Sequence, residues 1–230
     1  MPTHFSPKAL KFLRSLARHN DRAWFDPRKP TYERELKVPM LALIDEINHA
    51  LADFAPDHIR PPHKAMFRIY RDTRFSADKK PYKTHVAAWW VRAGLEKTSG
   101  AGFYFHIGPT ETVIAAGMYM PAPEQLLAVR RHLVEHHAEL RALLAGRKLR
   151  AAMQEFEGNR LKRAPRGFSE DSPAIDLLLC RQWGVSATLP AEAATQPTLL
   201  KQIVRRFQLA APIVHLLNTP LAGTRPAKRP

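Results

Sequence analysis

Between residues 66 and 119 apolar and polar side chains alternate, and this alternation constrains the fold more than any other feature. Successive side chains of a β-strand point to opposite faces, so a period of two predicts strands. The predicted strands are 66–75, 82–92, 103–107 and 112–119. The turns between them are short, whereas a parallel pair needs a crossover of about a dozen residues or more. We therefore predict an antiparallel meander of four or more strands over about 66–119, with 183–189 as a candidate addition.

Helical patterns flank this segment on both sides. Ser6 and Pro7 fit an N-cap followed by proline at the first helical position. Further helices are predicted from Thr31, with Pro39 as a kink or break, and over 124–144, 173–180 and 196–217. The expectation is a single α+β domain over 1–218, with N-terminal, central and C-terminal helices packed on the sheet. A mobile, basic, proline-containing tail is expected at 219–230.

Composition excludes several classes of protein. A chain of 230 residues with 45% hydrophobic and 25% charged residues is neither disordered nor fibrous. The only cysteine, Cys180, lies in apolar company and is expected to be an inert buried thiol; it excludes an intrachain disulfide and multi-cysteine metal sites. No apolar run approaches the ~20 residues of a membrane span, and the start lacks a signal peptide, so a cytoplasmic protein without membrane contact is expected. No cofactor motif is present, and none is predicted.

Positive charge is concentrated. The formal net charge is +15, and residues 60–92 contain nine Lys and Arg against two Asp, a local charge of +7. A second basic cluster spans 147–166. Concentrated positive charge attracts anions, whereas the plainer interpretation of such a cluster is a solubilising surface. The first cluster differs from a simple charge run because aromatic residues are interleaved with it.

The densest polar segment runs from Arg68 to His85. It fits R-x-x-R-D-x-R-F followed by D-K-x-x-Y-K, through Arg68, Arg71, Asp72, Arg74, Phe75, Asp78, Lys79, Tyr82 and Lys83. In this pattern the sequence resembles a bacterial family, domain of unknown function 2461 (DUF2461). Segments 20–25, 117–121 and 161–168 support the resemblance, which extends from about residue 5 to about 215. The resemblance implies no particular activity, so function has to be inferred from the residues.

The charges of this segment favour an anion site. Guanidinium groups bind phosphate and carboxylate through two parallel hydrogen bonds. The two carboxylates, Asp72 and Asp78, cannot neutralise the six nearby Lys and Arg side chains of 68–83, so an external anion is the simplest partner. The preferred hypothesis is an anion- or phosphate-group-binding site on the Arg68–His85 hairpin, for a phosphate-bearing small molecule or a nucleic acid.

Two alternatives stay open. In the first, the protein is an enzyme acting on a phosphorylated or carboxylated substrate, with the arginines stabilising charge. Asp72 or Asp78 would then be the base, and Tyr82 or Lys83 the acid. In the second, the motif is purely structural, and the two aspartates pair with neighbouring arginines to hold the loop. The catalytic residues and the oligomeric state cannot be assigned from the sequence.

Two other features have candidate chemistry. Residues 132–136 match H-x-x-E-H, in which two histidines one helical turn apart can share a zinc ion. His136 also falls on the apolar stripe of its helix, and so short a match is common, so no metal site is predicted. Trp89 and Trp90 place one indole on each face of a strand, one for the core and the other a candidate stacking platform.

Overall fold

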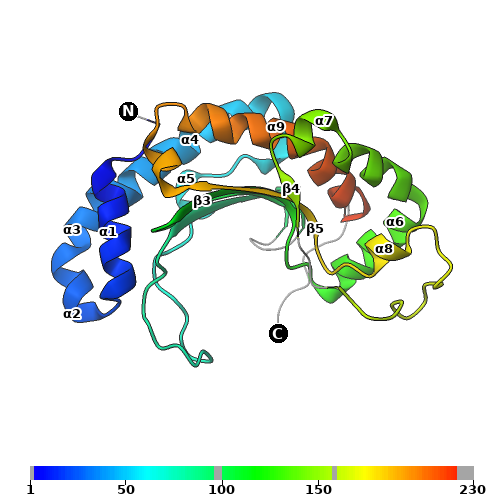
Figure 1. Ribbon diagram of the computed structural model, residues 1–230, viewed down its shortest axis with the longest axis horizontal. Helices are drawn as coiled ribbons and strands as arrows, with labels where there is room; N and C mark the ends of the chain where they lie inside the picture. Colours follow the sequence, from blue (N-terminus) through cyan, green and yellow to red (C-terminus); the bar gives the residue numbers. More distant parts are fainter. Residues whose placement is uncertain (1–2, 96–99, 157–159, 222–230) are drawn as a thin grey trace.

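A curved antiparallel sheet forms the centre of the computed structural model, which describes residues 3–95, 100–156 and 160–221 (Figure 1). Its strands are β1 (Val86–Val91), β2 (Gly102–Ile107), β3 (Glu111–Met118), β4 (Gln154–Glu155) and β5 (Trp183–Pro190). They pair in the order β1-β2-β3-β5-β4, and every pair is antiparallel. The α+β class and the fifth strand near 183–189 are therefore confirmed.

The helices lie before, between and after the strands, as the sequence predicts. They are α1 (Pro7–Arg18), α2 (Arg22–Phe25), α3 (Lys29–Tyr32), α4 (Val38–Phe54), α5 (Pro62–Ala65), α6 (Pro123–Leu144), α7 (Arg147–Arg150), α8 (Ile175–Leu178) and α9 (Leu199–Asn218). Shorter 3-10 turns are η1 (Asp26–Arg28), η3 (Pro56–His58), η4 (Ala191–Thr195) and η5 (Thr219–Leu221), and η2 (Glu33–Lys37) is a π-helical segment. None of the helices in the described ranges is both long and apolar enough to cross a membrane.

The predicted start and break of the N-terminal helices are correct. Ser6 caps α1, and its hydroxyl accepts a hydrogen bond from the Ala9 N–H at 3.3 Å. The break at Pro39 takes the form of the wide π turn η2, directly before α4. Proline has no N–H to donate to the carbonyl four residues back, that of Glu35, so a regular α-helical ladder is interrupted here.

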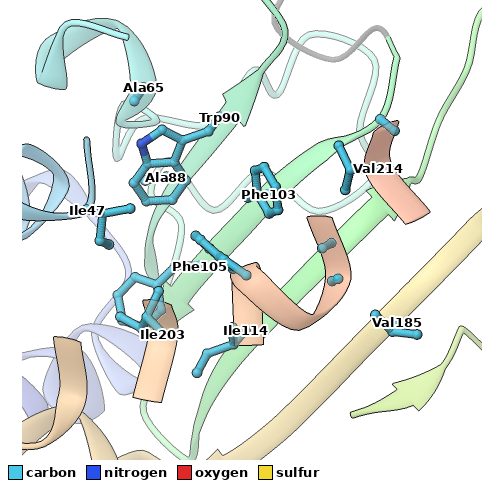
Figure 2. Packing of buried hydrophobic residues seen from close by; sticks show 14 of the residues in the cluster. Ile47, Ala65, Ala88, Trp90, Phe103, Phe105, Ile114, Val185, Ile203 and Val214 are labelled. Carbon is cyan, nitrogen blue, oxygen red and sulfur yellow. The ribbon is translucent and has the colours of Figure 1, made fainter. Parts of the chain in front are cut away.

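One face of the sheet packs against α4 and α9 (Figure 2). Trp90, Phe103 and Phe105 alternate along β1 and β2, are 0% exposed, and point to this face. The Trp90 indole donates to Asn48 Oδ1 at 3.1 Å, so its polar atom is paired inside the core. Burial of this aromatic face removes a large apolar area from water and stabilises the sheet.

Strands β3 and β5 approach each other closely at a pair of glycines, Gly117 and Gly184. Gly117 has a φ of +137°, and a Cβ added there would lie 2.3 Å from the Trp183 carbonyl oxygen. A Cβ on Gly184 would lie 2.6 Å from Cε2 of Phe156. The second glycine therefore lets the Phe156 ring lie against the sheet.

The opposite, concave face is left uncovered by helices of the described residues (Figure 1). In Figure 1, α4 and α9 lie above the sheet, α1 to α3 flank it on the left, and α6 and α8 lie on the right. The alternation that places Trp90 in the core places Trp89 on the concave face, and it does the same for Tyr104 and His106 on β2. This face can therefore hold a site.

The predicted strand at 66–75 is wrong. This segment and residues 76–85 form an irregular hairpin that extends below the sheet in Figure 1. Only single bridges occur, between Met66 and Ala88 and between Tyr70 and Tyr82. The side chain of Asn20 takes the place of a strand partner, because it donates to the Tyr82 carbonyl at 2.9 Å and accepts from the Tyr82 N–H at 3.0 Å. The hairpin is thus attached to the helical flank as well as to the sheet.

The C-terminal region follows the prediction in part. Helix α9 contains Pro212 and ends at Asn218, and residues 219–221 form η5. The rest of the predicted tail, 222–230, lies outside the described residues.

Candidate functional site

The backbone of the Arg68–His85 hairpin is held at its base. The Arg71 N–H donates to the Pro81 carbonyl at 2.8 Å, and the Lys83 N–H donates to the Ile69 carbonyl at 2.8 Å. The buried Tyr82 ring stacks on Phe25 of α2 with 4.0 Å between ring centroids. This packing fixes the direction in which Lys83 leaves the loop.

Asp72 and Arg74 form an exposed ion pair. Arg74 Nε donates to Asp72 Oδ1 at 3.0 Å, and Nη2 donates to Oδ2 at 2.7 Å. The Arg74 backbone N–H also donates to Oδ1, at 3.2 Å. The hydrogen bonds from Arg74 lower the pKa of the Asp72 carboxyl to about 2. A carboxylate so engaged is a poor proton acceptor near neutral pH, which argues against Asp72 as a general base.

A second ion pair closes the loop. Arg71 Nη1 donates to Asp78 Oδ2 at 2.7 Å and to the Lys80 carbonyl at 3.3 Å. The Lys80 backbone N–H in turn donates to Asp78 Oδ1 at 3.0 Å, and this bond is the main reason why the pKa of Asp78 is lowered, with Arg71 second. Lys79 Nζ donates to the Thr73 carbonyl at 3.0 Å. A purely structural motif would need contacts of this kind, in which aspartates pair with neighbouring arginines and hold the loop.

Several cations of the motif are left without a carboxylate. Within the described part of the chain, Arg68, Lys79, Lys80 and Lys83 form no ion pair. Arg68 is exposed, and Phe75 at the loop tip is 95% exposed, with the Arg74 guanidinium 5.7 Å from its ring centroid. The motif residues therefore do not converge on one point, and among them only Lys83 is both partly buried and unpaired.

The hairpin separates two hollows. The first, here called the loop hollow, has a volume of about 420 Å³ and lies between α2 and the hairpin, lined by Arg22, Asp26, Tyr70, Arg71, Thr73, Pro81 and Tyr82. Two of its polar side chains have partners, since Arg71 binds Asp78 outside the hollow and the Tyr82 hydroxyl donates to Asp26 at 3.4 Å. Burial, followed by the charge of Asp26, raises the pKa of Tyr82.

The second hollow, here called the sheet hollow, lies on the concave face and has a volume of about 520 Å³. Its apolar walls are Phe67, Trp89, Tyr104, Tyr119, Met120 and Phe156. Lys83, His85 and His106 provide its titratable groups, together with the hydroxyls of Tyr104 and Tyr119. A concave, mainly aromatic surface with a few polar groups is typical of small-molecule sites, which usually measure about 300–1,000 Å³.

Lys83 is the charged group of the sheet hollow. Its Nζ lies 4.9 Å from the Phe67 ring centroid, a cation–π contact. Burial, and then the nearby charge of Arg68, lower the pKa of Lys83. A partly buried ammonium without a carboxylate among the described residues favours the binding of an anion.

Two histidines lie beside Lys83. The rings of His85 and His106 are 5.0 Å apart between centroids, and burial lowers the pKa of each to about 4. The hydroxyl of Tyr104 and Nδ1 of His106 are 3.0 Å apart, and His106 Nε2 lies 3.7 Å from Glu111 Oε1. These positions fit a neutral His106 that accepts from the phenol and points its Nε2–H toward the carboxylate.

Trp89 adds an unpaired donor. It lines the sheet hollow, is only 8% exposed, and its indole Nε1 is buried with no hydrogen-bond partner among the described residues. The core indole of Trp90, by contrast, is paired. A buried N–H without a partner costs free energy, which an acceptor atom of a ligand would recover.

Sequence reasoning had singled out Lys83 and the Trp89–Trp90 pair, but it missed Tyr104 and His106. The alternation along the sequence could have identified Tyr104 and His106, because both lie on one face of a strand and Phe103 and Phe105 lie on its other face. What the sequence could not show is that no helix of the described residues covers this face.

The two histidines of the H-x-x-E-H segment contact each other on α6. The rings of His132 and His136 stack with 4.1 Å between centroids, and α6 is kinked at His136, where φ is −106° and ψ is 16°. No group of three or more His, Cys, Asp or Glu in the described ranges is arranged to hold a metal ion. Cys180 is buried, and burial raises the pKa of its thiol.

Comparison with known proteins gives a family and nothing closer. Residues 8–216 match a family model described as "Conserved hypothetical protein (DUF2461)". No curated protein and no solved structure matches the chain.

Proposed function

The chain belongs to the DUF2461 family of conserved hypothetical proteins, and from this premise we propose that it binds a small ligand carrying an anionic group and a planar apolar part. The anionic group, phosphate or carboxylate, contacts Lys83 at the base of the hairpin. The planar part lies in the sheet hollow, against Trp89 and Tyr104.

The unpaired, partly buried ammonium of Lys83 is the observation that carries this proposal. Water solvates a partly buried charge less well than an exposed one, and no carboxylate of the described residues compensates for this loss. An anionic ligand restores the missing partner in a setting of lowered dielectric constant, where the attraction is stronger than in water. The exposed Arg68 adds positive charge near Lys83 and aids the approach of the anion.

The apolar part of the ligand is inferred from the walls. All of them except Met120 are aromatic, and such surfaces favour a flat ring in stacked or edge-to-face contact. The volume of about 520 Å³ suits one small molecule. The unpaired Trp89 N–H favours a ligand that also offers an acceptor atom.

The two ion pairs of the hairpin have a separate, supporting role in this proposal. They shape the loop on which Lys83 is mounted, and the paired, low-pKa carboxylate of Asp72 takes no part in binding.

The test uses three simple aryl anions, namely benzoate, benzenesulfonate and phenyl phosphate. Fragments of this size bind with a Kd on the order of 1 mM, followed by tryptophan fluorescence or ligand-observed NMR. We expect Lys83→Met to weaken binding by about tenfold or more, because it removes the charge and keeps the length of the side chain. The matched control is Lys80→Met, whose ammonium is exposed and lies outside the sheet hollow. If none of the three anions binds, or if both variants bind as tightly as the unaltered protein, the proposal fails.

A further inference from the structure

Resting on the proposed function, we propose that the anionic group is a phosphate monoester, and that its binding draws a proton onto the His85–His106 pair. The sheet hollow would then select a doubly charged group over a singly charged one.

The geometry places both histidines next to the proposed anion position. His85 ends the hairpin just before β1, and His106 lies on the neighbouring strand β2. Both line the same hollow as Lys83, and their ring centroids are 5.0 Å apart. A proton on either ring would therefore lie close to an anion at Lys83.

The groups that face the pair set its charge. They are Lys83 on the hairpin, Tyr104 on β2, and Glu111 at the start of β3, while Ser186 contributes the lining from β5. Burial is the main reason why both histidines are neutral near pH 7, and for His85 the other histidine and Lys83 act in the same direction. The nearby carboxylate of Glu111 acts in the opposite direction on His85. Without ligand, Lys83 is thus the only full positive charge among the described residues that line the hollow.

A phosphate monoester changes this balance. It carries between about one and a half and two negative charges near pH 7, because its second pKa is about 6. The ammonium of Lys83 neutralises one negative charge of the phosphate. The second negative charge attracts a protonated His85 and so offsets the repulsion between that histidine and Lys83. The proton then has a favourable site on the histidine pair, where Glu111, 3.7 Å from His106 Nε2, supports the imidazolium. A carboxylate or sulfonate, with one charge, is already matched by Lys83 alone.

The sign of the pH dependence follows from this linkage. Because the complex holds a proton that the free protein lacks, the affinity for phenyl phosphate rises as the pH falls from about 8. The increase is at most about tenfold per pH unit for one proton, and it ends near the second pKa of the ligand, about 6, where the free ligand itself becomes singly charged. Benzenesulfonate has the same tetrahedral group without a second ionisation, so its affinity stays nearly constant over this range.

Titration calorimetry with phenyl phosphate and benzenesulfonate at about pH 7.5, in two buffers that differ in ionisation enthalpy, measures the protons taken up. We expect an uptake of about 0.5–1 proton on binding of phenyl phosphate and of about none on binding of benzenesulfonate. At about pH 6.5, phenyl phosphate should bind at least about tenfold more tightly than benzenesulfonate. The double variant His85→Asn/His106→Asn should lose the uptake, whereas the exposed-residue control His63→Asn should keep it. The ³¹P shift of the bound ligand and the histidine ring signals of the unaltered protein locate the proton without any substitution.

The outcomes separate the two proposals. If both anions bind through Lys83 with equal affinity and without proton uptake, the present inference is overturned and the proposed function stands. If uptake persists in the double variant, or the ³¹P shift shows a singly charged bound phosphate, the proton is on the ligand and the inference is again overturned. If neither anion binds, the proposed function itself has failed.

Discussion

Replacing Asn20 by alanine tests how the hairpin is held in place. The Asn20 side chain makes two hydrogen bonds to the backbone of Tyr82, at 2.9 and 3.0 Å. Each is worth about 1 kcal/mol net, and its loss costs more where the partner left behind is buried, so we expect Asn20→Ala to lower the free energy of unfolding by about 2–3 kcal/mol. With an m-value near 3 kcal/mol per M of urea, the unfolding midpoint would fall by about 0.7–1 M.

Urea unfolding followed by circular dichroism measures this change, and hydrogen exchange of the Tyr82 amide shows whether it is local. Asn20→Asp keeps the acceptor for the Tyr82 N–H and loses the donor, so an intermediate effect is expected. Lys11→Ala, on the exposed side of α1, is the control. A loss below about 0.5 kcal/mol for Asn20→Ala, with Tyr82 exchange unchanged, would refute the claim that this side chain attaches the hairpin.

Three further predictions concern the glycine pair, the ion pairs of the hairpin and the buried His58. Gly184→Ala should destabilise the protein by about 1–3 kcal/mol in urea unfolding, because the new Cβ meets the Ala116 carbonyl oxygen at 2.4 Å and Phe156 at 2.6 Å. Gly108→Ala, whose nearest contact is 3.5 Å, should change little, and equal effects would contradict this explanation. Arg71→Ala should speed tryptic cleavage after Lys79, since Arg71 binds both Asp78 and the Lys80 carbonyl, whereas Arg74→Ala, which breaks an exposed ion pair, should leave the urea midpoint unchanged. An unchanged cleavage rate in Arg71→Ala, or a lowered urea midpoint in Arg74→Ala, would contradict this prediction. The pKa of buried His58 is lowered to about 4, so the unfolded chain binds a proton that the folded one rejects, and stability should fall as the pH decreases from about 6.5 toward 4. His58→Gln should flatten this part of the pH profile of Tm, and an unchanged slope would show that His58 is not responsible.

The periodicity and capping signals of the sequence account for most of the fold. Ser6, Pro7 and Pro39 mark helix boundaries through local chemistry, and the alternation in 103–107 and 183–189 marks strands. The segment 66–75 has the same alternation but forms only single bridges, and Tyr82 on the facing arm of the hairpin bonds through its backbone to the side chain of Asn20, about 60 residues earlier in the chain. A contact between residues so far apart in the sequence cannot be recognised from the alternation of side chains within the segment.

The candidate site was only partly predictable for a similar reason. The charge count located the hairpin, and the expected pairing of Asp72 and Asp78 with arginines is present. Which cation stays unpaired beside an apolar surface depends on which face of the sheet the helices cover. That choice, which exposes Tyr104 and His106 to the hollow and buries Phe103, is made by tertiary packing.

The most direct test of ligand binding in the sheet hollow is the ¹H–¹⁵N spectrum of the tryptophan indoles. The chain has four tryptophans, and the indole N–H groups of Trp90 and Trp183 are already bonded inside the protein, to Asn48 Oδ1 and to the Leu177 carbonyl. Trp89 lines the hollow, and its buried indole N–H has no partner among the described residues. On titration with phenyl phosphate to about 10 mM, we expect a saturable shift of the Trp89 indole signal that Lys83→Met abolishes and Lys80→Met retains. An unmoved Trp89 signal, or a shift that survives Lys83→Met, would contradict this expectation.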